Sequence, residues 1–279
     1  MSAPDRVAAP RRTGPDPLWQ AADMGDRGEA GTGPAEQPLP GGFVNEVTRV
    51  GDTVRRVPPA TAPFTHALLR HFTRAGWRGA PRLLGVDERG REVLEYLPGR
   101  AAHTPAERRA ARGDETLAEV ATLVREFHEL TAGTSLAGKR EVVCHNDLSP
   151  RNTVYTEEGW RPLALLDWDG AAPGERIEDL AHVGWQYLGL GPDAGEPAEA
   201  ARRLRLLCDA YGLAGRAARA PLPDVVLWWQ DRCRRGIEAG AERGEPAMAR
   251  LVAAGVPAEV RRAHAWVVEH RATLAAALR

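Results

Sequence analysis

The pattern of apolar and polar positions divides the chain into a short β-rich part and a long helical part. After residue 40, short runs of apolar and polar residues are separated by turn residues such as Gly51-Asp52, which is typical of strands and hairpins. This pattern predicts strands over 41–45, 46–50, 53–57, 81–86 and 91–97, with one helix over 66–73. A small, mostly antiparallel sheet with one helix should result.

Beyond residue 99 the pattern predicts helices. Apolar residues recur every three or four positions from Leu117 to His128, so one face of a helix there would be apolar. Further helices are expected near 178–190, 198–212, 222–240 and 257–278. Between these helices lie a short strand ending at Cys144 and a hairpin of 153–156 with 162–166.

The first 39 residues lack this periodicity. They are rich in Pro, Gly, Ala and charge, so they cannot bury enough surface to offset their ordering entropy. Pro98-Gly99 breaks the chain between the β-rich and helical parts. The predicted organisation is therefore a disordered tail over 1–39, a small lobe over 40–97 and a larger helical lobe over 98–279.

Composition narrows the functional classes. The formal net charge of -1 and the pI of about 6.7 give no global electrostatic case for binding nucleic acid or a membrane. Three scattered cysteines are too few for a disulfide framework or a zinc site, and no stretch is long and apolar enough to span a bilayer. A cytoplasmic protein, monomeric or dimeric, is the expectation. Lys139 is its only lysine, so roles that usually fall to lysine must fall to arginine.

The segment from Cys144 to Asn152, with the apolar strand that ends at Asp167, indicates a specific chemistry. Asp147 can orient an attacking hydroxyl and accept its proton. Asn152 and Asp167 offer an amide oxygen and a carboxylate, which are ligands that Mg²⁺ accepts beside phosphate oxygens. The hairpin between them can bring the two together, so the spacing favours phosphoryl transfer.

Other interpretations of these residues are weaker. An isolated Asp147 would more often bond its own backbone in a turn. Asp167-Trp168-Asp169 also matches the Asp-x-Asp of haloacid dehalogenase-type phosphatases, but it lies late in the chain and no lysine follows it. Cys144 and His145 are adjacent on an extended segment and point to opposite faces, which excludes a nucleophile–base pair. Asp169 is left without a firm role.

These motifs, together with Asp179-Leu180-Ala181, resemble the aminoglycoside phosphotransferase family, relatives of choline kinase. The resemblance implies an α+β, two-lobed protein-kinase-like fold and Mg²⁺-dependent transfer from ATP, or from GTP, to a hydroxyl of a small molecule such as an amino sugar. It makes Asp147 the catalytic base and makes Asn152 and Asp167 the magnesium ligands. His145 and Asp179 would brace the loop, although Asp179 could simply favour the N-terminal end of its helix.

The small lobe carries the expected nucleotide site. Gly41 and Gly42 could let the backbone approach phosphates closely. Arg55 or Arg56 would supply the basic residue on the following strand, and Arg56 resembles the family position more closely. No acidic residue lies between Asp52 and Asp87, so the first helix cannot provide the glutamate that usually pairs with this residue.

Three further expectations concern the cleft. Glu95 to Leu97 resembles the connector between lobes, whose backbone would hydrogen-bond adenine. His66, on the first helix, is interpreted as a surface residue. The missing glutamate and the arginine in place of lysine keep open a second hypothesis, a catalytically silent relative that binds nucleotide or a ligand as a regulator.

The acceptor side is the hardest to predict. Aromatic residues on the later helices could line a pocket, although at helical spacing they are more often core; they are Trp185, Tyr187, Trp228 and Trp229. From residue 198 to the end, the chain contains 14 Arg and only 9 Asp plus Glu. This positive excess disfavours a polycationic aminoglycoside.

Overall fold

The computed structural model describes residues 35–39 and 47–279. The predicted strand over 41–45 lies outside these residues. Residues 35–39, assigned to the tail from the sequence, are described, and Gln37–Pro38 forms a short strand, β1, paired with β2. A paired strand therefore lies before the predicted boundary at 40.

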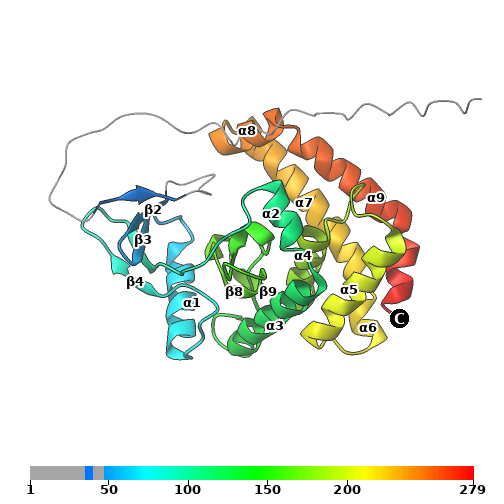
Figure 1. The fold of residues 1–279 in the computed structure, drawn as a ribbon, viewed down its shortest axis with the longest axis horizontal. Coiled ribbons are helices and arrows are strands. Elements are labelled where there is room, and N and C mark those ends of the chain that lie inside the picture. Colours follow the sequence, from blue (N-terminus) through cyan, green and yellow to red (C-terminus); the bar gives the residue numbers. More distant parts are fainter. Residues whose placement is uncertain (1–34, 40–46) are drawn as a thin grey trace, which may run out of the picture.

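A five-stranded antiparallel sheet forms one end of the molecule (Figure 1). Its order is β1-β2-β3-β5-β4, and its other strands are β2 (Val47–Val50), β3 (Thr53–Arg56), β4 (Leu83–Val86) and β5 (Glu92–Glu95). Helix α1 (Ala62–Arg74) links β3 to β4 and buries Leu68, Leu69 and Phe72. Strands β2 to β5 lie within the predicted ranges, whereas the helix is longer than predicted.

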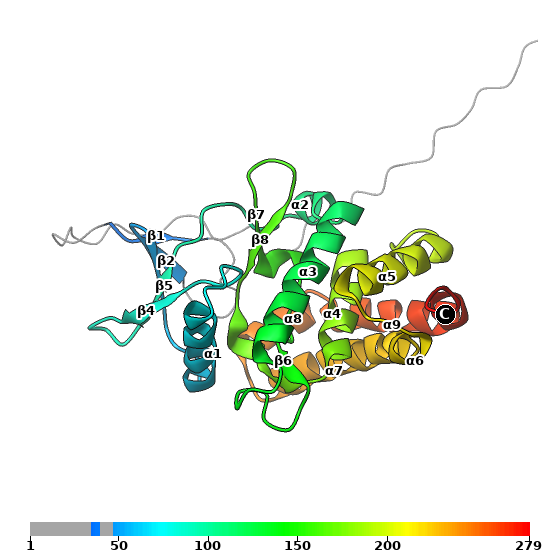
Figure 2. The same ribbon diagram turned by 90° about the horizontal axis from the view of Figure 1, so that it is seen from below.

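Helices form the other end of the molecule, as both views show (Figures 1 and 2). They are α2 (Pro105–Ala110), α3 (Asp114–Thr131), α4 (Arg176–Leu188), α5 (Pro197–Tyr211), α6 (Arg216–Arg219), α7 (Leu222–Glu242), α8 (Pro246–Ala253) and α9 (Val256–Ala277). The buried faces of α3, α4, α5, α7 and α9 share one core with α1, which includes Leu69, Val124 and Leu204. None of the helices that the structure describes has the length and hydropathy required to cross a bilayer.

Two small hairpin-like sheets lie between these ends. Strand β6 (Val142–Cys144) pairs with β9 (Ala172–Gly174), and β7 (Thr153–Tyr155) pairs with β8 (Pro162–Leu165). The loops that follow β6 and β8 carry Asp147 and Asp167. The architecture confirms the predicted α+β fold with a β-rich and a helical lobe.

Gly99 shows why the chain can pass tightly between the two ends. It has a φ of 134°, and a Cβ there would lie 2.4 Å from the backbone oxygen of Tyr155. The next residue, Arg100, forms a β-bridge with Tyr155. Only glycine fits this close approach of the connector to β7.

Candidate active site

A buried carboxylate holds the loop that follows β6. Asp179, on α4, accepts hydrogen bonds from the backbone N–H groups of His145 (2.7 Å) and Asn146 (2.9 Å). Its side chain is fully buried. Burial alone would favour the neutral acid, but the hydrogen bond and charge of His128 hold the pKa of Asp179 below its usual value. An ionised Asp179 therefore fixes the start of the loop.

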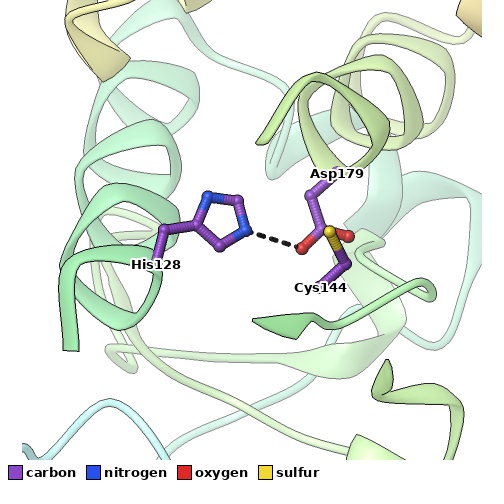
Figure 3. A group of neighbouring side chains, drawn as sticks. All are labelled: His128, Cys144 and Asp179. Atoms are coloured by element: carbon purple, nitrogen blue, oxygen red, sulfur yellow. Dashed lines mark hydrogen bonds and ion pairs between the residues drawn. The ribbon is translucent and has the colours of Figure 1, made fainter. Parts of the chain in front are cut away.

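His128, Cys144 and Asp179 gather their polar atoms within 4.8 Å of one another (Figure 3). His128 Nε2 lies 3.0 Å from an Asp179 oxygen, and its Nδ1 lies 2.8 Å from the Tyr211 hydroxyl. The Cys144 thiol donates to the Glu175 carbonyl, and burial raises its pKa, which keeps it protonated. Because every member already has a protein partner and the thiol is neutral, we interpret the cluster as a hydrogen-bonded brace rather than a metal site.

His145 ties this loop to the end of β8. Its Nε2 donates to the Leu166 carbonyl at 2.9 Å, so Nδ1 is left to accept from the Asp147 backbone N–H at 3.3 Å. Burial lowers the pKa of His145, which favours this neutral tautomer. The ring packs on Trp168 at 4.5 Å between centroids. His145 thereby links the segments that carry Asp147 and Asp167.

Asp147 is held by Asn152. The Asn152 amide nitrogen donates to the Asp147 carboxylate (2.7 Å) and to its backbone oxygen (2.9 Å). The Asp147 side chain is open on one side, yet the surrounding protein desolvates it and Asp167 repels its charge, which together raise its pKa to about 7. An aspartate with such a raised pKa has the proton affinity that a general base needs.

Asp167 and Asn152 lie side by side because the Leu166 N–H donates to the Asn152 carbonyl at 2.8 Å. Asp167 has a φ of 61°, in the left-handed region that Asp tolerates better than most residues, and its side chain is 48 % exposed. Since the Asn152 amide nitrogen faces Asp147, the amide oxygen is its remaining metal-ligating atom. A half-exposed carboxylate next to an amide oxygen fits Mg²⁺, so these two residues would hold the ion.

Arg56 reaches the same place from the sheet. Its Nη2 and Nη1 donate to the two Asp169 oxygens (2.5 and 3.1 Å), and Nη1 also lies 3.4 Å from Asp167. Burial lowers the pKa of Arg56, but the charges of Asp169 and Glu92 outweigh this and raise it. Arg55 instead points to Asp87, 3.7 Å away. Of the two arginines, Arg56 is therefore the one beside Asp167, and Asp169 gains a partner that the sequence did not reveal.

Glu92 supplies the acidic partner that the first helix lacks. It stands opposite Arg56 in the β3–β5 ladder and accepts from Arg56 Nε at 2.7 Å. Its other oxygen lies 2.6 Å from His66 Nε2 on α1, and its side chain is buried. The interpretation of His66 as a surface residue is therefore wrong. The signal that was missed is that the predicted strand over 91–97 carries two acidic residues, Glu92 and Glu95, so that the partner could come from this strand rather than from the helix.

The remaining predicted nucleotide residues fall into two groups. Gly41 and Gly42 lie outside the described residues. The Glu95 side chain is paired with Arg82 (2.9 Å), and its backbone N–H donates to the Arg82 carbonyl. Among residues 35–39 and 47–279, the Leu97 backbone has no hydrogen-bond partner.

A cavity of about 660 Å³ opens beside Asp147. Helix α7 provides most of its wall, together with His182 from α4. Trp229 is anchored by its indole N–H, which donates to the Glu178 carbonyl at 2.7 Å, whereas Trp228 is 46 % exposed. Of the four aromatic residues considered from the sequence, Trp228 and Trp229 line the cavity and Trp185 and Tyr187 belong to the core.

Comparison with known proteins agrees with this geometry. The sequence model described as "Phosphotransferase enzyme family" matches residues 133–222, which contain Asp147, Asn152, Asp167 and Asp179. The resemblance to the phosphotransferase family is confirmed. The match covers about a third of the chain, the part that forms the loops after β6 and β8 and the helices behind them.

Relatives of the phosphotransferase family share the fold over most of the chain. A choline/ethanolamine kinase family protein from Mesorhizobium loti superposes with a TM-score of 0.55 at 21% identity, covering 85% of this chain and 92% of that chain. The GDP complex of aminoglycoside 2'-phosphotransferase-IIIa gives 0.52 at 13% identity, covering 88% and 92%. The fold is therefore the protein-kinase-like one that was predicted.

One curated relative matches in sequence over nearly its whole length. The trifolitoxin immunity protein of Rhizobium leguminosarum bv. trifolii is 29% identical over 269 residues, which is 86% of this chain and 97% of that protein.

Proposed function

We propose that this protein transfers a phosphoryl group from a Mg²⁺-bound nucleoside triphosphate, ATP or GTP, to a hydroxyl of a small molecule. The observation that carries the proposal is the convergence of Asp147, Asn152, Asp167 and Arg56 at one place between the lobes. The family match and the nucleotide complex of a structural relative support the same class of reaction.

In this proposal each residue has one role. Asp147 hydrogen-bonds the acceptor hydroxyl and takes its proton as the oxygen attacks the terminal phosphorus and the bond to the nucleoside diphosphate breaks. Asn152 fixes the Asp147 carboxylate. Magnesium, when bound at Asn152 and Asp167, neutralises charge on the phosphates. Arg56 adds a planar cation next to them, in place of the usual lysine.

The hypothesis of a catalytically silent regulator loses its main support. It depended on the missing helix glutamate and on the arginine in place of lysine, and Glu92 provides an acidic partner for Arg56 from β5. Asp169 gives Arg56 a second carboxylate. A degraded site would not need to keep a buried carboxylate, a histidine and an arginine in one hydrogen-bonded set, so the enzyme hypothesis is favoured.

Nucleotide binding is the first test. Mg·ATP or Mg·GTP should raise the melting temperature of the protein, since a ligand that binds only the native state stabilises it. Slow hydrolysis of the same nucleotide should disappear in Asp167→Ala. Asp193→Ala, an exposed acidic residue of the α4–α5 loop, serves as the matched control. No stabilisation by either nucleotide, or hydrolysis that survives Asp167→Ala, would overturn the proposal.

A biological role in protection against a toxic compound is favoured by one observation, the near full-length similarity to the trifolitoxin immunity protein. Phosphorylation of such a compound would unite this role with the chemistry proposed here. Expression of the protein in a sensitive bacterium should then raise the inhibitory concentration of the compound. Expression of Asp147→Asn should not, and equal protection by the variant would separate immunity from phosphorylation.

A further inference from the structure

Two arginines bring positive charge to the cavity beside Asp147. Apart from Asp147, its charged lining residues are Arg232 and Arg235, both on α7 and both exposed to solvent. The histidine in its wall, His182, is neutral at physiological pH because burial lowers its pKa to about 4. An acceptor that enters to meet Asp147 therefore encounters two guanidinium groups.

These two arginines differ in how their charge is balanced. Arg235 forms an ion pair with Asp231 one turn earlier on α7. Arg232 has no carboxylate partner among the residues that the structure describes. Its guanidinium carbon lies 5.4 Å from the centre of the Trp228 ring and 5.8 Å from that of Trp229. Such contacts at the edge of cation–π range leave the guanidinium N–H groups free to donate to a ligand.

Apart from Asn146 and His182, the uncharged part of the wall is mainly apolar. Trp228 and Trp229 meet edge to face with centroids 4.8 Å apart, and Ile237 and Met248 are also among the lining residues. The cavity thus combines an apolar surface with one uncompensated cation and a base that receives a hydroxyl proton. An ammonium group would be repelled by Arg232, whereas a carboxylate or phosphate would form a charge-assisted hydrogen bond with it.

We propose that the acceptor of this protein is an alcohol that bears an anionic group, a carboxylate or a phosphate, on an apolar or aromatic scaffold. Arg232 holds the anion, the two tryptophans hold the scaffold, and the hydroxyl reaches Asp147. This specificity rests on the proposed phosphotransferase function. It sets the protein apart from enzymes whose acceptors are cations.

Four probes that differ only in one substituent test this specificity. They are 4-(2-hydroxyethyl)benzoate, the phosphate ester 4-(2-hydroxyethyl)phenyl phosphate, the neutral 4-(2-hydroxyethyl)benzamide, and the cationic 4-(2-hydroxyethyl)benzylamine. Binding is measured by calorimetry, and transfer by phosphate incorporation from Mg·ATP. We expect the better anionic probe to bind at least about tenfold more tightly than the amide, as hydrogen bonds to charged groups predict. The anionic probe that binds more tightly shows whether the natural acceptor carries a carboxylate or a phosphate.

Variants assign the effect to Arg232. Arg232→Gln should lose the preference for anions while binding the amide unchanged, and Arg232→Glu should prefer the amine. Arg262→Gln, an exposed arginine on α9 outside the cavity, is the matched control. Stabilisation by Mg·ATP is measured in parallel, so that loss of the phosphotransferase function is distinguished from a wrong acceptor class. Equal binding of all four probes, tighter binding of the amine, or no binding of either anion at millimolar concentration would overturn the proposal.

Discussion

Arg56 joins the two lobes because it binds one carboxylate from each of them. Glu92 holds it from the adjacent strand and Asp169 from the segment after β8. An arginine fork satisfies both at once through Nε and the two terminal nitrogens, which a lysine ammonium on a flexible stem would not do in the same fixed geometry. In the proposed nucleotide site, this arrangement would place a cation at the phosphates in a chain that has a single lysine.

Glu92→Gln tests this arrangement. Without the carboxylate charge, Arg56 should be less well fixed, and we expect nucleotide hydrolysis to fall about 10- to 100-fold, as loss of a charged hydrogen bond predicts. The measurement is kcat and KM for the nucleotide at a temperature below the melting point of the variant. Glu88→Gln, in the exposed β4–β5 turn, should behave as the wild type. Wild-type kinetics in Glu92→Gln would show that Arg56 does not depend on Glu92.

His182 links the cavity wall to stability. It is buried, donates from Nδ1 to the Leu148 carbonyl at 2.9 Å, and packs on the rings of Trp185 and Trp229. Burial lowers its pKa from 6.5 to about 4, although the Leu148 carbonyl and the charge of Asp179 oppose this.

The consequence is a pH dependence with a defined sign. Below pH 6.5, His182 of the unfolded chain becomes protonated, whereas His182 of the native protein stays neutral until about pH 4. This group alone therefore lowers the free energy of unfolding by up to about 1.4 kcal/mol per pH unit across that window as the pH falls. In His182→Asn, which keeps an N–H donor, urea unfolding should show a shallower loss of stability between pH 6 and pH 4.5. Equal slopes in the two proteins would contradict the buried, neutral state.

At the scale of elements, the sequence predicts most of the core scaffold because its long helices and strands carry clear periodicity. The stripe from Leu117 to His128 lies within α3, and the predicted hairpin agrees with β7 and β8. Short elements were missed: β1, α2, α6, α8 and β9. The Thr104 capping box with Glu107 and Pro105 at the first turn is a sequence signal that identifies α2. Strand β9 contains Pro173, which argues against a strand unless pairing with β6 is known.

The residues of the candidate site also fall into those that the sequence predicts and those that it does not. Asp147, Asn152 and Asp167 could be singled out because they lie in two short motifs separated by a hairpin that the sequence itself predicts. The pairing of Arg56 with Glu92 could not, since it depends on which strands become neighbours: β5 pairs directly with β3, and β4 lies at the edge. The position of Arg232 in the cavity likewise could not be predicted, because it depends on the packing of α7 beside the loop after β6. Contacts between distant parts of the chain are set by packing, which local sequence does not encode.

At the scale of the whole molecule, one aromatic cluster joins the lobes. Phe72 of α1 lies 5.0 Å from Trp168, which follows β8, and 6.4 Å from Phe127 of α3. Trp168 is almost fully buried, and its indole N–H donates to the Leu165 carbonyl. Because α1 belongs to this shared core, the sheet and the helices should not unfold independently.

Denaturation tests this coupling. We expect one transition in urea, with coincident curves from far-UV circular dichroism and tryptophan fluorescence. Phe72→Ala should lower the free energy of unfolding by about 3–5 kcal/mol and shift both curves together. Val268→Ala, at an exposed position of α9, should change it by less than about 0.5 kcal/mol. Two separate transitions in the wild type would show that the lobes are stabilised independently.

The central claim is that Asp147 serves as the base in phosphoryl transfer at a nucleotide site built by Asn152, Asp167 and Arg56. Asp147→Asn tests it most directly, because the change removes the proton acceptor while keeping the shape of the side chain. Hydrolysis of the nucleotide, and transfer to any acceptor found in the probe set, should fall about 10²- to 10⁴-fold. Stabilisation of the protein by the Mg·nucleotide should persist. Wild-type turnover in Asp147→Asn would contradict the claim.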